Sequence, residues 1–140
     1  MRLRGLVPAL LALLLAGPVV AQQSYIAAPS AAELRAAAAG DVLLVDIREP
    51  WEWRQTGVLP EAVLLTFESP EQFLRGLAPH LDGRPVALIC RSGNRTAQAA
   101  AFLSRVVEAP VIDLSGGMLR LMAEGYAPAA PTAAQGCAVC

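Results

Sequence analysis

Short apolar runs alternate along the chain with segments that carry helix signals. The largely apolar runs have strand length and occupy residues 24–26, 42–45, 62–65, 85–89 and 110–114. A run that is apolar at consecutive positions, rather than at every second one, is typical of a strand buried on both faces of a sheet. The intervening segments predict helices over residues 30–40, 70–80, 96–107 and 118–124. This alternation predicts one α/β domain whose parallel sheet is covered by helices on both faces.

Two of these helices have recognisable ends in the sequence. Ser30 is a good N-cap for the first helix, and Gly40 is a typical C-terminal stop. Ser69 and Gln72 form a capping box for the second helix, with Pro70 at its first position. The segment around Trp51 and Trp53 is assigned to neither a helix nor a strand.

The first 21 residues have the layout of a secretory signal peptide. Arg2 and Arg4 precede an apolar block over residues 6–20, and Ala21 completes a small-residue cleavage signal. An uncleaved membrane anchor is the alternative, but the block is short of the roughly 20 apolar residues that a span needs and contains Pro8. We therefore expect cleavage after Ala21, a periplasmic or secreted protein, and no membrane attachment after cleavage.

Charge and composition give two further predictions. The 140 residues carry 11 basic and 12 acidic side chains, and the net charge of -1 leaves no basic surface for nucleic acid. Residues 22–127 have the composition of a folded domain, whereas residues 128–140 are rich in alanine, proline and small polar residues. We predict that residues 128–140 form a flexible tail outside the core.

Cys90 is the main candidate for chemistry. It ends the most hydrophobic predicted strand and directly precedes a helix, which is where active sites of parallel sheets form. Loop amides, the helix dipole and the positive charges of Arg91 and Arg95 would together favour a thiolate, the nucleophilic form of cysteine. The alternative is a cysteine that only fills the core. The run of polar, charged and glycine residues after Cys90 argues against it, because a buried loop would leave too many polar groups unpaired.

The segment from Cys90 to Arg95 (Cys-Arg-Ser-Gly-Asn-Arg) resembles the cysteine loop of the rhodanese-like sulfurtransferases. The resemblance extends over residues 24–127 through the earlier Val-Asp-Ile-Arg-Glu-Pro segment at 45–50 and the glycine pair at 116–117. It implies a parallel five-stranded sheet with helices on both faces, and a catalytic cysteine that carries sulfur as a persulfide. The residues that match the sulfur-binding loop are Arg91, Ser92, Gly93, Asn94, Arg95 and Thr96. Asp46 and Arg48 match supporting positions.

The chain departs from the family pattern at three positions. The usual Gly-His-Ile-Pro-Gly-Ala motif has Val58 in place of histidine and Glu61 in place of the second glycine, and Leu121 replaces a common tryptophan. These changes affect local packing and the partner surface, and they leave the cysteine loop unchanged.

The resemblance implies transfer of sulfane sulfur from an anionic donor such as thiosulfate to a thiol or cyanide, with no cofactor and no metal. A noncatalytic redox or binding module of the same family is one alternative. A phosphatase or arsenate reductase is another, but related phosphatases place five residues between cysteine and arginine, whereas four separate Cys90 from Arg95. A periplasmic redox protein is a candidate partner.

The remaining candidates are weaker. Cys137 and Cys140 have the spacing of a redox pair, and either could act as a resolving thiol toward Cys90 or both could close a disulfide that leaves Cys90 free. His80 is more consistent with a charge at a helix end than with a catalytic base. Trp51 and Trp53 are more consistent with packing than with a binding platform.

Overall fold

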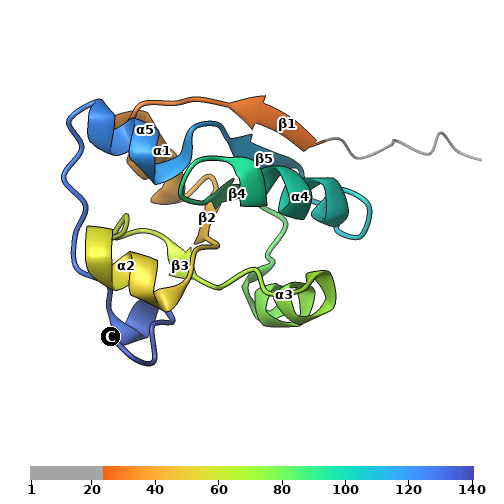
Figure 1. Ribbon diagram of the computed structural model, residues 1–140. Helices are drawn as coiled ribbons and strands as arrows, with labels where there is room; N and C mark the ends of the chain where they lie inside the picture. The colour runs from red at the N-terminus through yellow and green to blue at the C-terminus, as the bar shows by residue number, and fades with distance from the viewer. Residues whose placement is uncertain (1–23) are drawn as a thin grey trace, which may run out of the picture.

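The structure, a computed structural model, describes residues 24–140, so the predicted signal peptide over residues 1–21 lies outside the described residues. Five parallel strands form one sheet in the order β1-β5-β4-β2-β3 (Figure 1). The strands are β1 (Ser24–Ala27), β2 (Leu43–Asp46), β3 (Val63–Leu64), β4 (Val86–Ile89) and β5 (Val111–Leu114). The predicted α/β fold with a parallel five-stranded sheet is confirmed.

The three central strands are the most apolar runs of the sequence. Every residue of β2, β4 and β5 is buried, as expected for strands that helices cover on both faces. The register pairs Asp46 with Ile89, so the carboxyl ends of β2 and β4 meet at one edge of the sheet. The residues that follow these two strands are therefore brought together.

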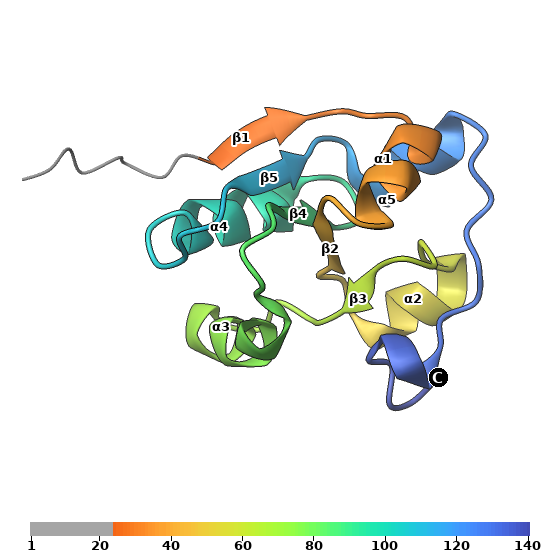
Figure 2. The same cartoon turned by 180° about the vertical axis from the view of Figure 1, so that it is seen from behind.

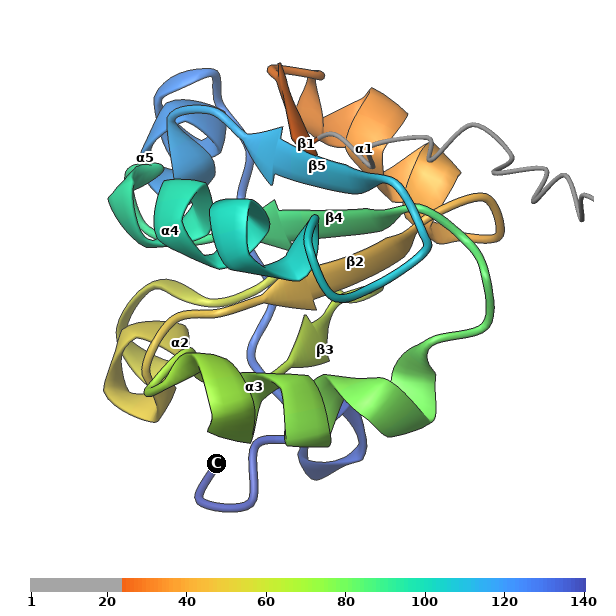
Figure 3. The same cartoon turned by 90° about the vertical axis from the view of Figure 1, so that its right-hand side faces the viewer.

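Helices cover both faces of the sheet (Figures 2 and 3). The helices are α1 (Ala31–Ala38), α2 (Pro50–Thr56), α3 (Pro70–Leu77), α4 (Asn94–Leu103) and α5 (Gly117–Ala123), with short 3-10 turns η1 (Ala78–His80) and η2 (Ala133–Gln135). Helices α1, α2 and α5 share one core cluster with one face of the strands. Helices α3 and α4 share the second cluster with the other face.

Two helices differ from the sequence prediction. Helix α2 was not expected, although Pro50 stands at its first turn and Glu49 and Glu52 form its capping box. Helix α4 begins two residues earlier than predicted and ends at Leu103, not at 107. The Leu103 carbonyl accepts from the amides of both Val106 and Val107 at 2.9 Å, which turns the chain out of the helix.

The predicted flexible tail is instead a packed segment, which we call the C-terminal strap (residues 128–140). Ala129 and Val58 form an antiparallel bridge with N–H···O distances of 2.7 and 2.9 Å. The Gln135 side-chain amide donates to the carbonyls of Leu59, Pro60 and Ala62 at 3.1 to 3.2 Å. Cys137 is 1% exposed and belongs to the core. The expectation of a tail outside the core is therefore wrong, because these partners lie far away in the sequence.

Within residues 24–140, no helix has both the length and the apolar character needed to cross a bilayer.

Candidate active site

Cys90 lies at the carboxyl end of β4, on the floor of a loop that we call the cysteine loop (residues 90–96). Its side chain is 1% exposed and packs in the cluster shared with α3 and α4. The Gly93 N–H donates to Cys90 Sγ at 3.1 Å, and Thr96 Oγ1 lies 3.8 Å from the same sulfur. The Thr96 hydroxyl itself donates to the Gly93 carbonyl at 2.8 Å, so the Gly93 N–H is the group of the loop that donates to the sulfur.

The cysteine loop turns directly into α4 at Gly93. Gly93 has φ of 106°, a backbone conformation that favours glycine, and this turn aims its N–H back at the sulfur. Helix α4 starts at the next residue, Asn94, so the positive end of its dipole also faces the loop. Both features place positive potential at the cysteine loop.

Helix α5 closes against the loop from the other side. The Met118 N–H donates to the Cys90 carbonyl at 2.9 Å, and the Leu119 N–H donates to the Arg91 carbonyl at 3.0 Å. A Cβ at Gly117 would lie 2.6 Å from the Arg91 carbonyl oxygen and closer still to that of Cys90. The second glycine of the 116–117 pair is thus required for this close approach.

Arg95 is not a free charge. Its guanidinium donates to both carboxylate oxygens of Glu52 on α2 at 2.6 and 2.7 Å. Burial by itself would raise the pKa of Glu52, but the hydrogen bonds from Arg95 and from the Glu49 backbone together lower it below its ordinary value. The hydrogen bonds to Glu52 raise the pKa of Arg95. The charge of Glu52 therefore balances that of Arg95.

Arg91 keeps its charge available. Its side chain is exposed, and within residues 24–140 it makes no ion pair. Of the two arginines in the cysteine loop, Arg91 is thus the one that can attract an anion. Ser92 and Asn94 of the same loop are also exposed.

Asp46, at the end of β2, and Arg48, in the loop that joins β2 to α2, form a buried pair. Asp46 is 0% and Arg48 1% exposed, and Arg48 Nη2 lies 2.7 Å from Asp46 Oδ2. The same guanidinium donates to Thr56 Oγ1 at 2.7 Å and to the Gly57 carbonyl at 2.8 Å. The pair thus fixes the C-terminal end of α2 against the segment that precedes the helix.

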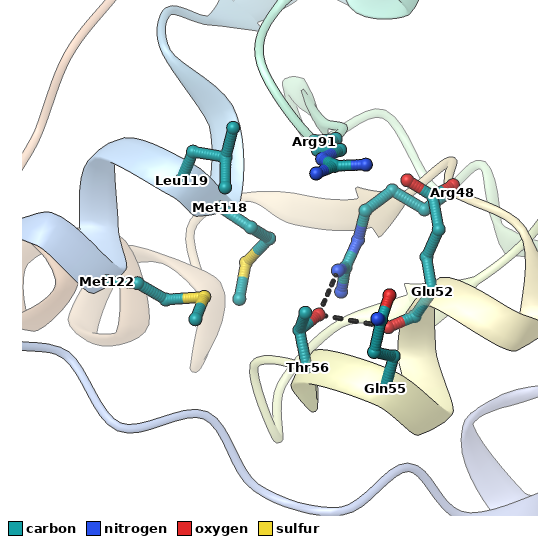
Figure 4. Close-up of a pocket in the computed structure, with 8 residues that line it drawn as sticks. All are labelled: Arg48, Glu52, Gln55, Thr56, Arg91, Met118, Leu119 and Met122. Carbon is teal, nitrogen blue, oxygen red and sulfur yellow. Dashed lines mark hydrogen bonds between the residues drawn. The ribbon is translucent and has the colours of Figure 1, made fainter.

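A pocket of about 160 Å³ lies between α2 and α5, beside the cysteine loop. Figure 4 shows the residues that line it: Arg48, Glu52, Gln55, Thr56, Arg91, Met118, Leu119 and Met122. The α2 side is polar, and the α5 side consists of two methionines and a leucine. Neither Glu52 nor this α5 wall is among the residues predicted from the sequence. The only local signal was the position of Glu52, three residues after Glu49.

The other candidates lie apart from this site. His80 is exposed in η1 at the end of α3. Trp53 is 2% exposed in the core, which confirms its packing role, whereas Trp51 is 50% exposed. No group of three or more His, Cys, Asp and Glu residues in the described part of the chain could hold a metal ion.

Cys137 and Cys140 form a disulfide, and Cys90 is free. This is one of the two outcomes weighed from the sequence. Cys137 packs in the cluster shared with α1, α2 and α5, whereas Cys90 packs in the other cluster. A resolving role toward Cys90 would therefore require the strap to leave its position.

Comparison with known proteins gives one family for this chain. The family described as the rhodanese-like domain matches residues 30–124. A protein named sulfurtransferase from Allochromatium vinosum is 36% identical over 91 residues, which are 65% of this chain and 81% of that protein.

Solved structures agree with this fold. A rhodanese-related protein from Thermoplasma volcanium is 29% identical, with a TM-score of 0.56 over 71% of this chain and 93% of that chain. A protein of unknown function from Rhodopseudomonas palustris, described as a possible tyrosine phosphatase, is 25% identical, with a TM-score of 0.52 over 71% of this chain and 82% of that chain. The strap lies beyond the segment that the family matches.

Proposed function

This chain belongs to the rhodanese-like domain family and is a sulfurtransferase of that family, and we propose that it moves sulfane sulfur through a persulfide on Cys90. The donor is a small anion such as thiosulfate, and the acceptor is a thiol or cyanide. One observation carries this proposal: the Gly93 N–H donates to Cys90 Sγ at 3.1 Å where α4 begins.

In the first step the Cys90 thiolate attacks the outer sulfur of thiosulfate. A bond forms between Cys90 Sγ and that sulfur, the S–S bond of thiosulfate breaks, and its electron pair leaves with sulfite. The exposed charge of Arg91 attracts the dianion to the mouth of the loop. Glu52 holds Arg95 and so keeps the loop in shape for the attack.

In the second step the acceptor removes the outer sulfur and returns Cys90 to its thiolate. Until then the persulfide is an anion, which backbone N–H groups of the cysteine loop and the α4 dipole stabilise. These donors are fixed before the reaction, so no reorganisation is needed when the charge appears. The chemistry uses no metal or organic cofactor.

The short loop disfavours phosphoryl chemistry. Four residues separate Cys90 from Arg95, and Arg95 is already bound by Glu52 through both carboxylate oxygens. An arginine held in this way has fewer free donors and less net charge to offer a phosphate. A noncatalytic module of the same family remains the second candidate, and it would take up sulfur without turnover.

On the basis of the expected signal peptide, we propose that the reaction takes place in the periplasm or in the medium. N-terminal sequencing of the exported protein tests this part of the proposal, with cleavage after Ala21 as the expected result.

Intact mass spectrometry tests the chemistry. After exposure to thiosulfate, the wild-type protein should gain one sulfur atom, which peptide mapping assigns to Cys90, and cyanide should remove it as thiocyanate. Cys90→Ser should gain none. Repeated turnover separates a transferase from a sensor that loads once. Uptake of sulfur by Cys90→Ser would contradict the proposal.

A further inference from the structure

The two outer strands of the sheet differ in how their free edges are covered. The strap covers β3: the Gln135 side-chain amide donates to the Ala62 carbonyl at 3.2 Å, and a Cβ at Gly136 would lie 2.5 Å from the Leu64 carbonyl oxygen. At the other end of the sheet, no segment within residues 24–140 pairs with the outer side of β1 (Figures 1 and 2). The backbone donors and acceptors on that side are therefore free to bind another strand.

The hydrogen bonds to β5 show which groups of β1 point outward. The Ala27 carbonyl accepts from the Ser115 N–H at 2.9 Å, so the backbone groups of Ala27 face β5. Because this direction alternates along a strand, the N–H and C=O of Ile26 point away from the sheet. The side chains do not protect this edge, since none of the four residues of β1 is charged or a proline. Tyr25 is 50% exposed and Ile26 is 74% exposed.

An apolar cavity of about 190 Å³ adjoins the same strand. It lies between α1 and the sheet, and most of its lining is aliphatic, as with Leu34, Ile112 and Leu114. Tyr25 and Ala27 also line it, so the cavity extends to the edge of the sheet at β1. A cavity of this volume can hold one aromatic ring.

We propose that the outer edge of β1 is a self-association surface and that its partner is a second copy of this chain. The two β1 strands pair antiparallel about a two-fold axis at Ile26. In that register the two Ile26 residues exchange N–H···O=C bonds, because their backbone groups are the ones that point outward.

The same register brings an aromatic ring to the cavity. Tyr25 of the second copy stands directly opposite Ala27, with the two Cα atoms about 4.5 Å apart. Opposed residues of an antiparallel pair project to the same face of the sheet, so this ring lies at the α1 face beside the cavity and packs into it. The two-fold axis repeats the contact, and one surface thus supplies both the cavity and the ring that fills it.

The size of this surface predicts a weak dimer. Stable dimers bury about 800 Å² per partner, and a strand of four residues with one aromatic anchor buries less. We therefore expect reversible association with a dissociation constant on the order of 10 to 100 μM. The cysteine loops, which follow the carboxyl ends of the strands, lie at opposite ends of the joined sheet and stay open.

Sedimentation velocity of the exported protein, at concentrations on both sides of about 100 μM, measures the association. Wild type should change from monomer to dimer as the concentration rises. Ile26→Lys places two like charges opposite each other at the two-fold axis and should remain a monomer. Ile26→Pro removes the outward N–H, leaves the bonds to β5 in place, and should also remain a monomer. Circular dichroism checks the fold, and either variant suffices where the other does not fold.

A third variant tests the cavity, and a fourth is the control. Tyr25→Ala should weaken association at least tenfold, because each dimer loses two buried rings. Val106→Lys introduces the same charge at another exposed apolar residue, 49% exposed on the α3 side of the molecule, and should dimerise as wild type does.

Cross-linking tests the register. In a Cys90→Ser background, a short bismaleimide should join two copies of Ile26→Cys into a covalent dimer and should not join two copies of Val106→Cys. A wild-type protein that stays monomeric at the highest concentration would overturn the proposal, and so would a dimer that Ile26→Lys and Ile26→Pro form as readily as wild type. Sulfur transfer by Ile26→Lys should equal that of wild type, so this proposal and the proposed function are tested separately.

Discussion

The cysteine loop and the C-terminal strap both contain cysteine and pack against the same sheet. The loop is stabilised by contacts between neighbouring residues, whereas the strap is stabilised by contacts with residues far away in the sequence. The loop takes its shape from neighbouring residues: β4 ends, Gly93 turns the backbone, and α4 starts at once. The strap takes its shape from partners such as Leu59 and Ala62, more than 70 positions before Gln135. The comparison teaches that local sequence predicts a site well only where the site is made by consecutive residues.

The largest difference between the two regions should be in reactivity. Cys90→Ser should abolish sulfur transfer while the protein stays folded, because a hydroxyl is a poor nucleophile and cannot hold a persulfide. The strap cysteines should not replace it, since they are joined to each other. A thiosulfate-to-cyanide assay with a circular dichroism control measures this. Residual transfer with sulfur mapped to Cys137 or Cys140 would remove the distinction between the two regions.

The second effect concerns stability. A chain that ends at Pro128 loses the buried Cys137, the Gln135 hydrogen bonds and the bridge to Val58, and it should lose roughly 4 kcal/mol of unfolding free energy. Urea denaturation measures the loss. Gln135→Ala, which removes only the side-chain hydrogen bonds, should lose about 1 kcal/mol. An unchanged midpoint for the truncated chain would restore the interpretation of a flexible tail.

The third effect tests the contact that connects α2 to the cysteine loop. Glu52→Gln leaves Arg95 without its counter-charge and should cost about 2 kcal/mol at neutral pH. Folding lowers the pKa of Glu52, so this contribution is complete above its ordinary value of 4.5 and is lost as the pH falls further.

Urea denaturation of wild type and Glu52→Gln at pH 7 and at pH 3 checks that sign, because the gap between the two proteins should narrow at the lower pH. Glu71→Gln, an exposed carboxylate on α3, provides the control. A gap that is equal at both pH values would mean that the charge of Glu52 is not what stabilises the contact.

The smallest effect should come from the disulfide itself. Cys140→Ser opens a loop of only four residues, and the chain entropy of so short a loop limits the loss to under about 2 kcal/mol. Cys137 should stay buried as a thiol, because a free cysteine packs as a small apolar side chain. Thermal unfolding with and without a dithiol reductant measures this. A loss as large as that of the truncated chain would mean that the disulfide alone holds the strap.

The sequence predicted most of the sheet and the cysteine loop, and the reasons are local. The apolar runs at β2, β4 and β5 are continuous, and Ser30 and Ser69 cap their helices as expected. The pair of Glu52 with Arg95 was missed because 43 positions separate the two residues. Helix α2 was missed because its capping box starts with a glutamate, which is not a usual N-cap residue.

The separation of the two core clusters has a consequence for thiol–disulfide exchange. Cys90 packs on one face of the sheet, and Cys137, which is bonded to Cys140, packs on the other. The sheet therefore separates the two sulfur sites of this small protein. The thiol–disulfide equilibrium at each site is then set by the small molecules that reach that site. A titration in a glutathione redox buffer should show the Cys137–Cys140 disulfide and a mixed disulfide of Cys90 with glutathione as two independent transitions, and loading Cys90 with sulfur should leave the midpoint of the Cys137–Cys140 transition in place.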